Sequence, residues 1–79
     1  MGYVQHKSEE SLEDYLETIL ILSKTLPVVR SIDIANELNF SKPSVSVAMK
    51  NLKTRNYITV SKDGYINLTE SGREIAERV

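Results

Sequence analysis

The chain has 79 residues, enough for one small domain near the lower size limit of a single hydrophobic core. Its hydrophobic fraction of 41% and charged fraction of 27% are typical of a folded chain, and the absence of cysteine excludes disulfides and thiolate metal sites. The longest apolar run, residues 19–22, is too short to cross a membrane, and no signal peptide precedes it. We therefore expect a cytoplasmic protein without membrane contact.

The net charge of −1 conceals an uneven distribution. Residues 1–40 carry a net charge of −4 and residues 63–79 carry −2, whereas residues 41–62 carry +5 and contain no acidic residue. A basic stretch of this kind indicates a phosphate-bearing partner such as DNA. A solvated basic face that arose by chance is the weaker alternative.

The amino-terminal part predicts an arm followed by a helix. Residues 1–10 are polar without periodicity and are expected to form a flexible arm. Ser11 is suited to cap the helix, which is expected to reach about Thr25, before Pro27. Its inner face is formed by Leu12, Tyr15, Leu16, Ile19 and Leu20.

The next stretch has the pattern of two short helices joined by a tight turn. Ser31 is expected to cap a helix over residues 32–38, and Asn39 to end it in the left-handed conformation. Ser41 is expected to cap a third helix over residues 42–56. The inner stripe of this helix is Val45, Ala48, Met49 and Leu52, and its outer surface carries Lys42, Pro43, Ser44, Ser46, Val47, Lys50 and Lys53. The layout predicts a helix-turn-helix, with a helical hairpin that only packs as the alternative.

The remaining residues predict a hairpin and a last helix. Two alternating runs, 57–60 and 65–68, flank Asp63-Gly64, which favours a type I′ turn and places Lys62 near the tip of a wing. Thr69 is expected to cap a helix over residues 70–79 with the apolar stripe Ile75, Ala76 and Val79.

The predicted fold is mainly α with a small β-hairpin. It is a winged helix-turn-helix over residues 11–79, with a three-helix core, a two-stranded wing and the start of a fourth helix. Because the last helix has no terminating glycine or proline, we expect the chain to be the amino-terminal piece of a longer protein, whose dimerisation and metal-binding part would follow.

Two carboxylates on the first helix are candidate metal ligands. Asp14 and Glu17 are three residues apart and therefore neighbours on one helix face. Carboxylate oxygens suit Mn²⁺, Fe²⁺ or Mg²⁺, although further ligands would have to come from elsewhere. Spacing alone favours the alternative, a solvated acidic face.

Several short motifs resemble one family of repressors. They are Ser11-Leu-Glu-Asp-Tyr-Leu-Glu-Thr-Ile-Leu, Ile34-Ala35, Ser44-Val45-Ser46, Leu52, Tyr57-Ile58, Leu68-Thr69 and Gly72. Over residues 11–79 the chain resembles the amino-terminal half of the manganese- and iron-dependent repressors of the diphtheria toxin repressor family, above all the manganese transport regulator branch. The resemblance implies a cytoplasmic homodimer that, when loaded with Mn²⁺ or Fe²⁺, binds palindromic operators in double-stranded DNA upstream of metal-uptake genes.

The resemblance also assigns roles to residues. It places Asp14 and Glu17 on two metal-ligand positions, in the pattern of the manganese branch. The remaining ligands would lie beyond Val79, so we expect no tightly bound metal in this chain, and His6 matches no ligand position. It places Ser41, Lys42, Pro43, Ser44, Ser46, Val47 and Lys50 at the start of the recognition helix. Lys50 and Lys53 would then meet phosphates, Lys62 would meet the flanking backbone or minor groove, and Val47 could pack on a thymine methyl group.

The leading hypothesis is therefore the DNA-binding domain of a metal-dependent repressor. One alternative is a winged-helix regulator without metal sensing, and another is a winged helix that binds proteins. An enzyme is not expected, because the sequence has a single histidine, no cysteine and no glycine-rich phosphate loop.

Overall fold

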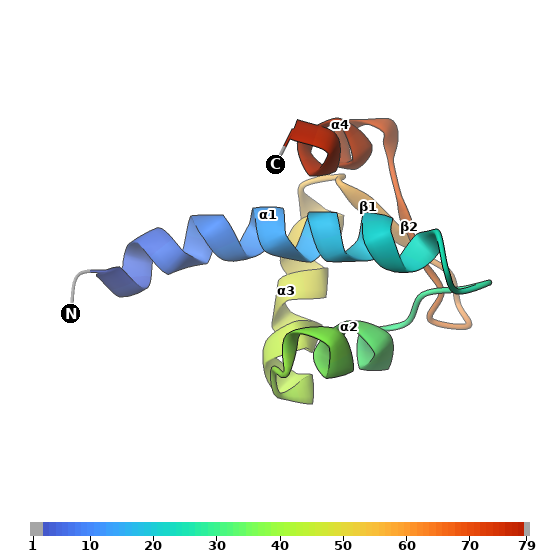
Figure 1. Ribbon diagram of the computed structural model, residues 1–79, viewed down its shortest axis with the longest axis horizontal. Coiled ribbons are helices and arrows are strands. Elements are labelled where there is room, and N and C mark those ends of the chain that lie inside the picture. Colours follow the sequence, from blue (N-terminus) through green and yellow to red (C-terminus); the bar gives the residue numbers. More distant parts are fainter. Residues whose placement is uncertain (1–2, 79) are drawn as a thin grey trace.

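The computed structural model describes the backbone of residues 3–78 and the side chains of residues 12–78. The elements follow in the order α1 (Tyr3–Ser23), α2 (Ser31–Leu38), α3 (Lys42–Thr54), β1 (Ile58–Val60), β2 (Ile66–Leu68) and α4 (Glu70–Arg78). Helix α1 crosses the middle of the molecule, with α4 on one side and α2 on the other (Figure 1). This architecture confirms the predicted winged helix-turn-helix. None of the helices within the described residues is long and apolar enough to cross a membrane.

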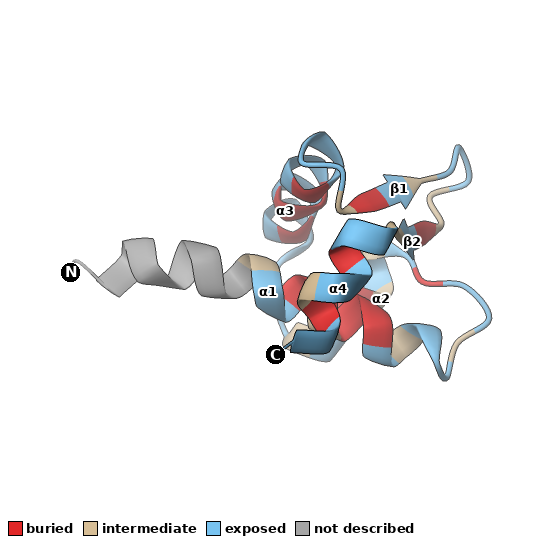
Figure 2. Cartoon of the chain, turned by 90° about the horizontal axis from the view of Figure 1, so that it is seen from above, coloured by how far each residue is buried: buried red, intermediate tan, exposed pale blue. Residues whose placement is uncertain are grey.

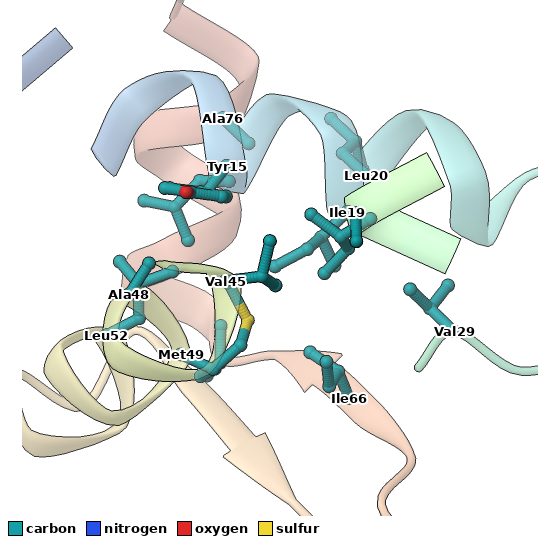
Figure 3. Packing of buried hydrophobic residues seen from close by; sticks show 14 residues of the cluster. Tyr15, Ile19, Leu20, Val29, Val45, Ala48, Met49, Leu52, Ile66 and Ala76 are labelled. Carbon is teal, nitrogen blue, oxygen red and sulfur yellow. The ribbon is translucent and has the colours of Figure 1, made fainter. Parts of the chain in front are cut away.

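The core is assembled around the second half of α1. Leu16 and Ile19 are almost completely buried (Figure 2), and Ile19 points toward Val45 of α3 (Figure 3). The predicted inner residues of α3 are all buried, namely Val45, Ala48, Met49 and Leu52. Helix α4 covers the opposite side of α1 with Ala76. The outer surface of α3, in contrast, is exposed along its length (Figure 2).

Helix α1 begins earlier than the sequence predicted. Its first residue is Tyr3 and not a residue after Ser11, so Ser11 is not the N-cap and most of the predicted arm over residues 1–10 is helical. Residues 3–10 contain no proline or glycine and include several good helix formers, so nothing interrupts the helix before Ser11. The helix ends at Ser23, close to the predicted end and before Pro27.

Helix α2 also starts one residue earlier than predicted. Arg30, and not Ser31, is its N-cap. The Arg30 backbone N–H donates to Oδ2 of Asp33 at 2.9 Å, so a carboxylate in the first turn satisfies the amide that precedes the helix. The predicted left-handed end is confirmed, since Asn39 has φ 59° and ψ 41°.

Helix α3 ends at Thr54, two residues before its predicted end. Asn56 has φ 66°, a left-handed conformation that stops the helix. The amides of Asn56 and Tyr57 turn back to the carbonyls of Lys53 and Leu52, both at 3.0 Å. This is the bonding pattern of a Schellman motif, which satisfies carbonyls that the helix leaves without partners.

The hairpin is present, but its turn differs from the predicted type. Ile58 pairs with Leu68 and Val60 with Ile66 in an antiparallel ladder. In the turn only Gly64 has a positive φ, of 86°, whereas a type I′ turn also needs one at Asp63. Five residues separate the strands, so the chain turns through Ser61–Gly64, closed by a 2.9 Å bond from the Gly64 N–H to the Ser61 carbonyl.

Helix α4 is fixed to the end of α3 by its first residues. The Thr69 hydroxyl accepts from the Gly72 N–H at 3.1 Å, which confirms the predicted cap, and it donates to the carbonyl of Asn56 at 2.8 Å. The Thr69 N–H donates to the carbonyl of Tyr57 at 3.0 Å. Gly72 is buried directly against this connection. The two buried or partly buried stripe residues of α4, Ala76 and Ile75, confirm the predicted inner face over its described part.

Candidate nucleic-acid interface

The outer face of α3 presents the predicted contact residues to solvent. All nine are exposed: Ser41, Lys42, Pro43, Ser44, Ser46, Val47, Lys50, Lys53 and, on the hairpin, Lys62. Val47 is 59% exposed, the largest value among the large hydrophobic residues that the structure leaves uncovered. An exposed valine in the middle of a polar and basic helix face contributes nothing to the core, so it is available for an apolar contact with a ligand.

The charge of this face is of one sign. Lys42, Lys50 and Lys53 lie on α3, Arg55 follows it, and Lys62 lies in the turn of the hairpin. No acidic residue occurs from position 41 to position 62. The turn of the hairpin and the amino-terminal half of α3 both lie on the side of α1 that faces away from α4 (Figure 1). The segments that carry Lys42 and Lys62 therefore lie on the same side of α1.

The start of α3 is built from a reciprocal serine pair. The Ser44 N–H donates to Oγ of Ser41 at 3.3 Å, and the Ser41 hydroxyl donates to Oγ of Ser44 at 2.9 Å. The cap predicted for Ser41 is thus confirmed, and Pro43 lies in the first turn, where no backbone N–H is needed. Since the Ser44 oxygen is the acceptor in this pair, its own hydroxyl proton remains available for a phosphate oxygen.

The turn between α2 and α3 is held to α1 by two aromatic rings. Phe40 meets Tyr15 edge to face, with ring centroids 5.9 Å apart and an interplanar angle of 72°. Tyr15 is buried in the core, and burial raises the pKa of its phenol. This contact fixes the point from which α3 leaves, and therefore the direction of its exposed face.

Asp14 and Glu17 lie together on α1, as their spacing predicted. Asp14 is exposed and Glu17 is partly exposed, so both carboxylates can be reached from solvent. Their oxygen chemistry fits Mn²⁺ or Fe²⁺, but two carboxylates are only part of a coordination shell. Among the residues whose side chains are described, no group of three histidine, cysteine, aspartate or glutamate residues could hold a metal ion. The side chain of His6 lies outside that range.

Arg30 is a basic residue near the wing that the sequence did not predict as part of the site. Arg30 is exposed, and its guanidinium lies over the ring of Tyr65, with Cζ 5.0 Å from the ring centroid. The two residues are 35 positions apart, and neither belongs to a recognisable motif. Only the fold brings them together, so no single-sequence signal could have found the pair.

Comparison with known proteins identifies the family and the fold. A family model described as iron dependent repressor, N-terminal DNA binding domain, matches residues 7–66. The HTH-type transcriptional regulator MntR of Geobacillus kaustophilus (strain HTA426) is 35% identical over 69 residues, which are 87% of this chain and 49% of that protein. The chain thus spans about half the length of this relative.

Solved winged-helix regulators share the fold at low sequence identity. MepR, a transcription regulator of the Staphylococcus aureus multidrug efflux pump MepA, superposes with a TM-score of 0.62 at 21% identity, covering 99% of this chain and 72% of its own. The Mycobacterium tuberculosis MarR family protein Rv2887, in complex with DNA, gives 0.61 at 15% identity, with 99% and 71% covered. At these identities the likeness concerns the fold alone.

Proposed function

Since the chain belongs to the iron-dependent repressor family, in which it corresponds to the amino-terminal DNA-binding domain, we propose that α3 enters the major groove of double-stranded DNA and that the hairpin contacts the flanking backbone. The observation that carries this proposal is the continuous exposed face of α3, which is basic, free of acidic residues and rich in small hydroxyl groups. The family consists of transcriptional repressors and not enzymes. Its metal dependence favours this function over a regulator without metal sensing or a protein-binding module.

Each exposed side chain has a chemically suited role on DNA. Lys42, Lys50 and Lys53 would pair with phosphates, and Ser41, Ser44 and Ser46 would donate to phosphate oxygens or base edges near the start of the helix. Pro43 fixes the backbone φ angle in the first turn of α3, the turn that would approach the DNA. Lys62 would meet the backbone or minor groove beside the site.

The exposed Val47 side chain is expected to recognise a thymine base. Its exposed methyl groups can pack on the C5-methyl group of thymine, which uracil lacks. Replacing the contacted thymine by deoxyuridine should weaken binding by about 1 kcal/mol, or about fivefold, the worth of one buried methyl group. The measurement is fluorescence anisotropy on a duplex selected by the chain from a random-sequence library, with thymines replaced one at a time. In the Val47→Ala variant the same replacement should have a clearly smaller effect, because two of the contacting methyl groups are gone, and an equal loss in both proteins would show that Val47 does not contact the base.

For the metal we propose Asp14 and Glu17 as two ligands of a site completed by a longer chain. Support comes from their shared helix face, their access to solvent and their oxygen chemistry, together with the metal dependence of the family. We propose Mn²⁺ or Fe²⁺ as the ion, with weak binding to the 79 residues alone because two ligands leave most of the coordination shell to water. A bound ion would supply positive charge that neutralises the two adjacent carboxylates.

Asp14→Ala tests this site. In a chain extended to the length of its relatives, the variant should lose the increase in DNA affinity that MnCl₂ causes, because one of the carboxylate ligands is gone. Glu13→Ala is the matched control, since Glu13 is the preceding exposed carboxylate on the same helix. Anisotropy titrations with and without the metal give the result. If Asp14→Ala still responds to the metal, or if both variants lose the response equally, Asp14 is not a specific metal ligand but a solvated surface residue.

The assembly of the whole protein is also a proposal. We propose a homodimer that binds a palindromic operator upstream of metal-uptake genes and acts in the cytoplasm. A two-fold dimer places two recognition helices one helical turn of DNA apart, which a palindrome matches. The relative MntR is about twice as long as the matched region, which leaves room for a dimerisation part outside that region.

A further inference from the structure

Arg30 and Tyr65 join the helix-turn-helix to the wing. The Arg30 guanidinium stacks over the Tyr65 ring, 5.0 Å from its centroid, and Nη2 donates to the Tyr65 hydroxyl oxygen at 3.3 Å. Among the described residues this is the one side-chain hydrogen bond between the hairpin and the helix-turn-helix. An exposed cation–π contact of this kind is weak by itself, and here a hydrogen bond joins the same two side chains.

The backbone next to this contact is fixed on both sides. The Val29 carbonyl accepts from the Ile66 N–H at 2.8 Å, so strand β2 is bonded to the segment that precedes α2. The next residue, Arg30, is the N-cap of α2, and its carbonyl accepts from the Asp33 and Ile34 amides at 3.0 and 3.3 Å. Residues 29 and 30 therefore hold β2 and the start of α2 at the same time.

The tip of the wing needs such a restraint. Each strand of the hairpin has three residues, and a two-stranded hairpin of this length is marginal by itself. Ile58 at the base and Ile66 in the pair next to the turn anchor the strands in the core, but Ser61, Lys62 and Asp63 in the turn itself are all exposed.

Tyr65 is placed to transmit the restraint to Lys62. Its N–H donates to Oγ of Ser61 at 3.1 Å, and its carbonyl accepts from the Ser61 N–H at 2.9 Å. Tyr65 is thus bonded twice to the residue that immediately precedes Lys62. A ring held from outside the hairpin therefore holds one end of the turn that carries the lysine.

We propose that Arg30 and Tyr65 are positioning residues, which lock the wing against the amino terminus of α2 so that Lys62 meets the DNA backbone at a fixed distance from α3. The proposal rests on the DNA-binding function proposed above. Arg30 acts here through Tyr65 and does not itself neutralise a phosphate. Arg30 thus differs from the lysines of α3, which would contact phosphates directly. A positioning residue and a phosphate contact give different salt dependences when each is combined with Lys62→Ala.

The test is a set of double-mutant cycles on the 79-residue chain. Lys62→Ala is made in the wild-type, Tyr65→Ala and Arg30→Gln backgrounds, and affinity for a duplex selected from a random-sequence library is measured from about 50 to 200 mM salt. In the wild type, Lys62→Ala should reduce the slope of log affinity against log salt by about 0.9, the value for one phosphate contact. Tyr65→Ala and Arg30→Gln should each cause the same reduction, and adding Lys62→Ala to either should change the slope no further.

Two control variants separate positioning from charge and from folding. Arg73→Gln removes one exposed arginine on α4 and should leave the slope unchanged. Tyr65→Phe keeps the ring under the guanidinium but removes the hydroxyl that accepts from Arg30, so its slope should lie between those of the wild type and Tyr65→Ala. Tyr65→Ala could loosen the hairpin by itself. Arg30→Gln changes only an exposed side chain, so its slope still tests the positioning role in that case.

Each other outcome overturns the proposal. If Lys62→Ala lowers the slope equally in all three backgrounds, the pair does not position the wing. A further reduction on adding Lys62→Ala to Arg30→Gln alone would make Arg30 a phosphate contact. If Lys62→Ala has no effect in the wild type, the wing does not meet DNA, although recognition by α3 stands. A chain that selects no DNA from the library would overturn the proposed function itself.

Discussion

Replacing Gly72 by alanine is expected to destabilise the domain by about 3 kcal/mol, because the added methyl group has no space. A Cβ atom at this position would lie 2.0 Å from the carbonyl oxygen of Tyr57 and 2.9 Å from its carbonyl carbon. Both are backbone atoms, so relief requires α4 to move away from the end of α3 and to weaken the Thr69 bonds that join them. In a domain whose total stability is on the order of 5 kcal/mol, this is a large fraction.

Gly64→Ala is the matched control for this variant. At Gly64 nothing lies within 4 Å of an added Cβ, but φ is +86°. The cost there is the strain of a left-handed alanine, about 1 kcal/mol. In urea unfolding monitored by far-ultraviolet circular dichroism, Gly72→Ala should therefore have a much lower midpoint than Gly64→Ala. Equal midpoints for the two variants would show that α4 accommodates the methyl group by a small shift.

Removing the three lysines of α3 is expected to abolish DNA binding at physiological salt. In the Lys42→Ala, Lys50→Ala, Lys53→Ala triple variant, three proposed phosphate contacts are lost. At about 0.9 per contact, the slope of log affinity against log salt should fall by about 2.7. All three side chains are exposed, so the fold should persist, which circular dichroism can check. The affinity measurement is anisotropy with a selected duplex over a salt series.

The control for the triple variant has the same net charge but changes other surfaces. Lys24→Ala, Arg73→Ala and Arg78→Ala also remove three positive charges, from the end of α1 and from α4. These residues lie outside the acid-free stretch, so the slope should stay close to that of the wild type. If both triple variants lost the same affinity, binding would depend on the total charge of the chain and not on the face of α3.

Local signals in the sequence predicted most of the helix-turn-helix and wing. Ser41, Asn39 and Thr69 act within a few residues of their own position, so their capping roles could be predicted without knowledge of the fold. The same holds for the hairpin around Asp63-Gly64, since alternation and turn residues are local as well. The predicted turn type was wrong. The length of the loop decides which φ values the turn adopts, and that length depends on where the short strands end.

The start of α1 was predicted wrongly because a residue suited to cap a helix does not by itself end the helix that precedes it. Ser11 is a suitable N-cap residue, but the preceding residues continue the helix, so α1 begins at Tyr3. Features that depend on distant segments could not be predicted at all. Gly72 belongs to the repressor pattern, yet its close approach to Tyr57 becomes visible only when α4 packs beside the end of α3. The Arg30–Tyr65 contact is of the same kind. The roles of Asp14 and Glu17 and of the nine DNA-contact candidates stay predictions.

The packing of α4 on α1 has a consequence for the synthesis of the protein. These two helices lie at opposite ends of the described chain, yet they share one side of the core. During translation α1, α2 and α3 leave the ribosome first, and the surface that Ala76 later covers stays open to water until α4 emerges. The nascent domain therefore carries exposed apolar surface until α4 has emerged, and surface of this kind favours aggregation.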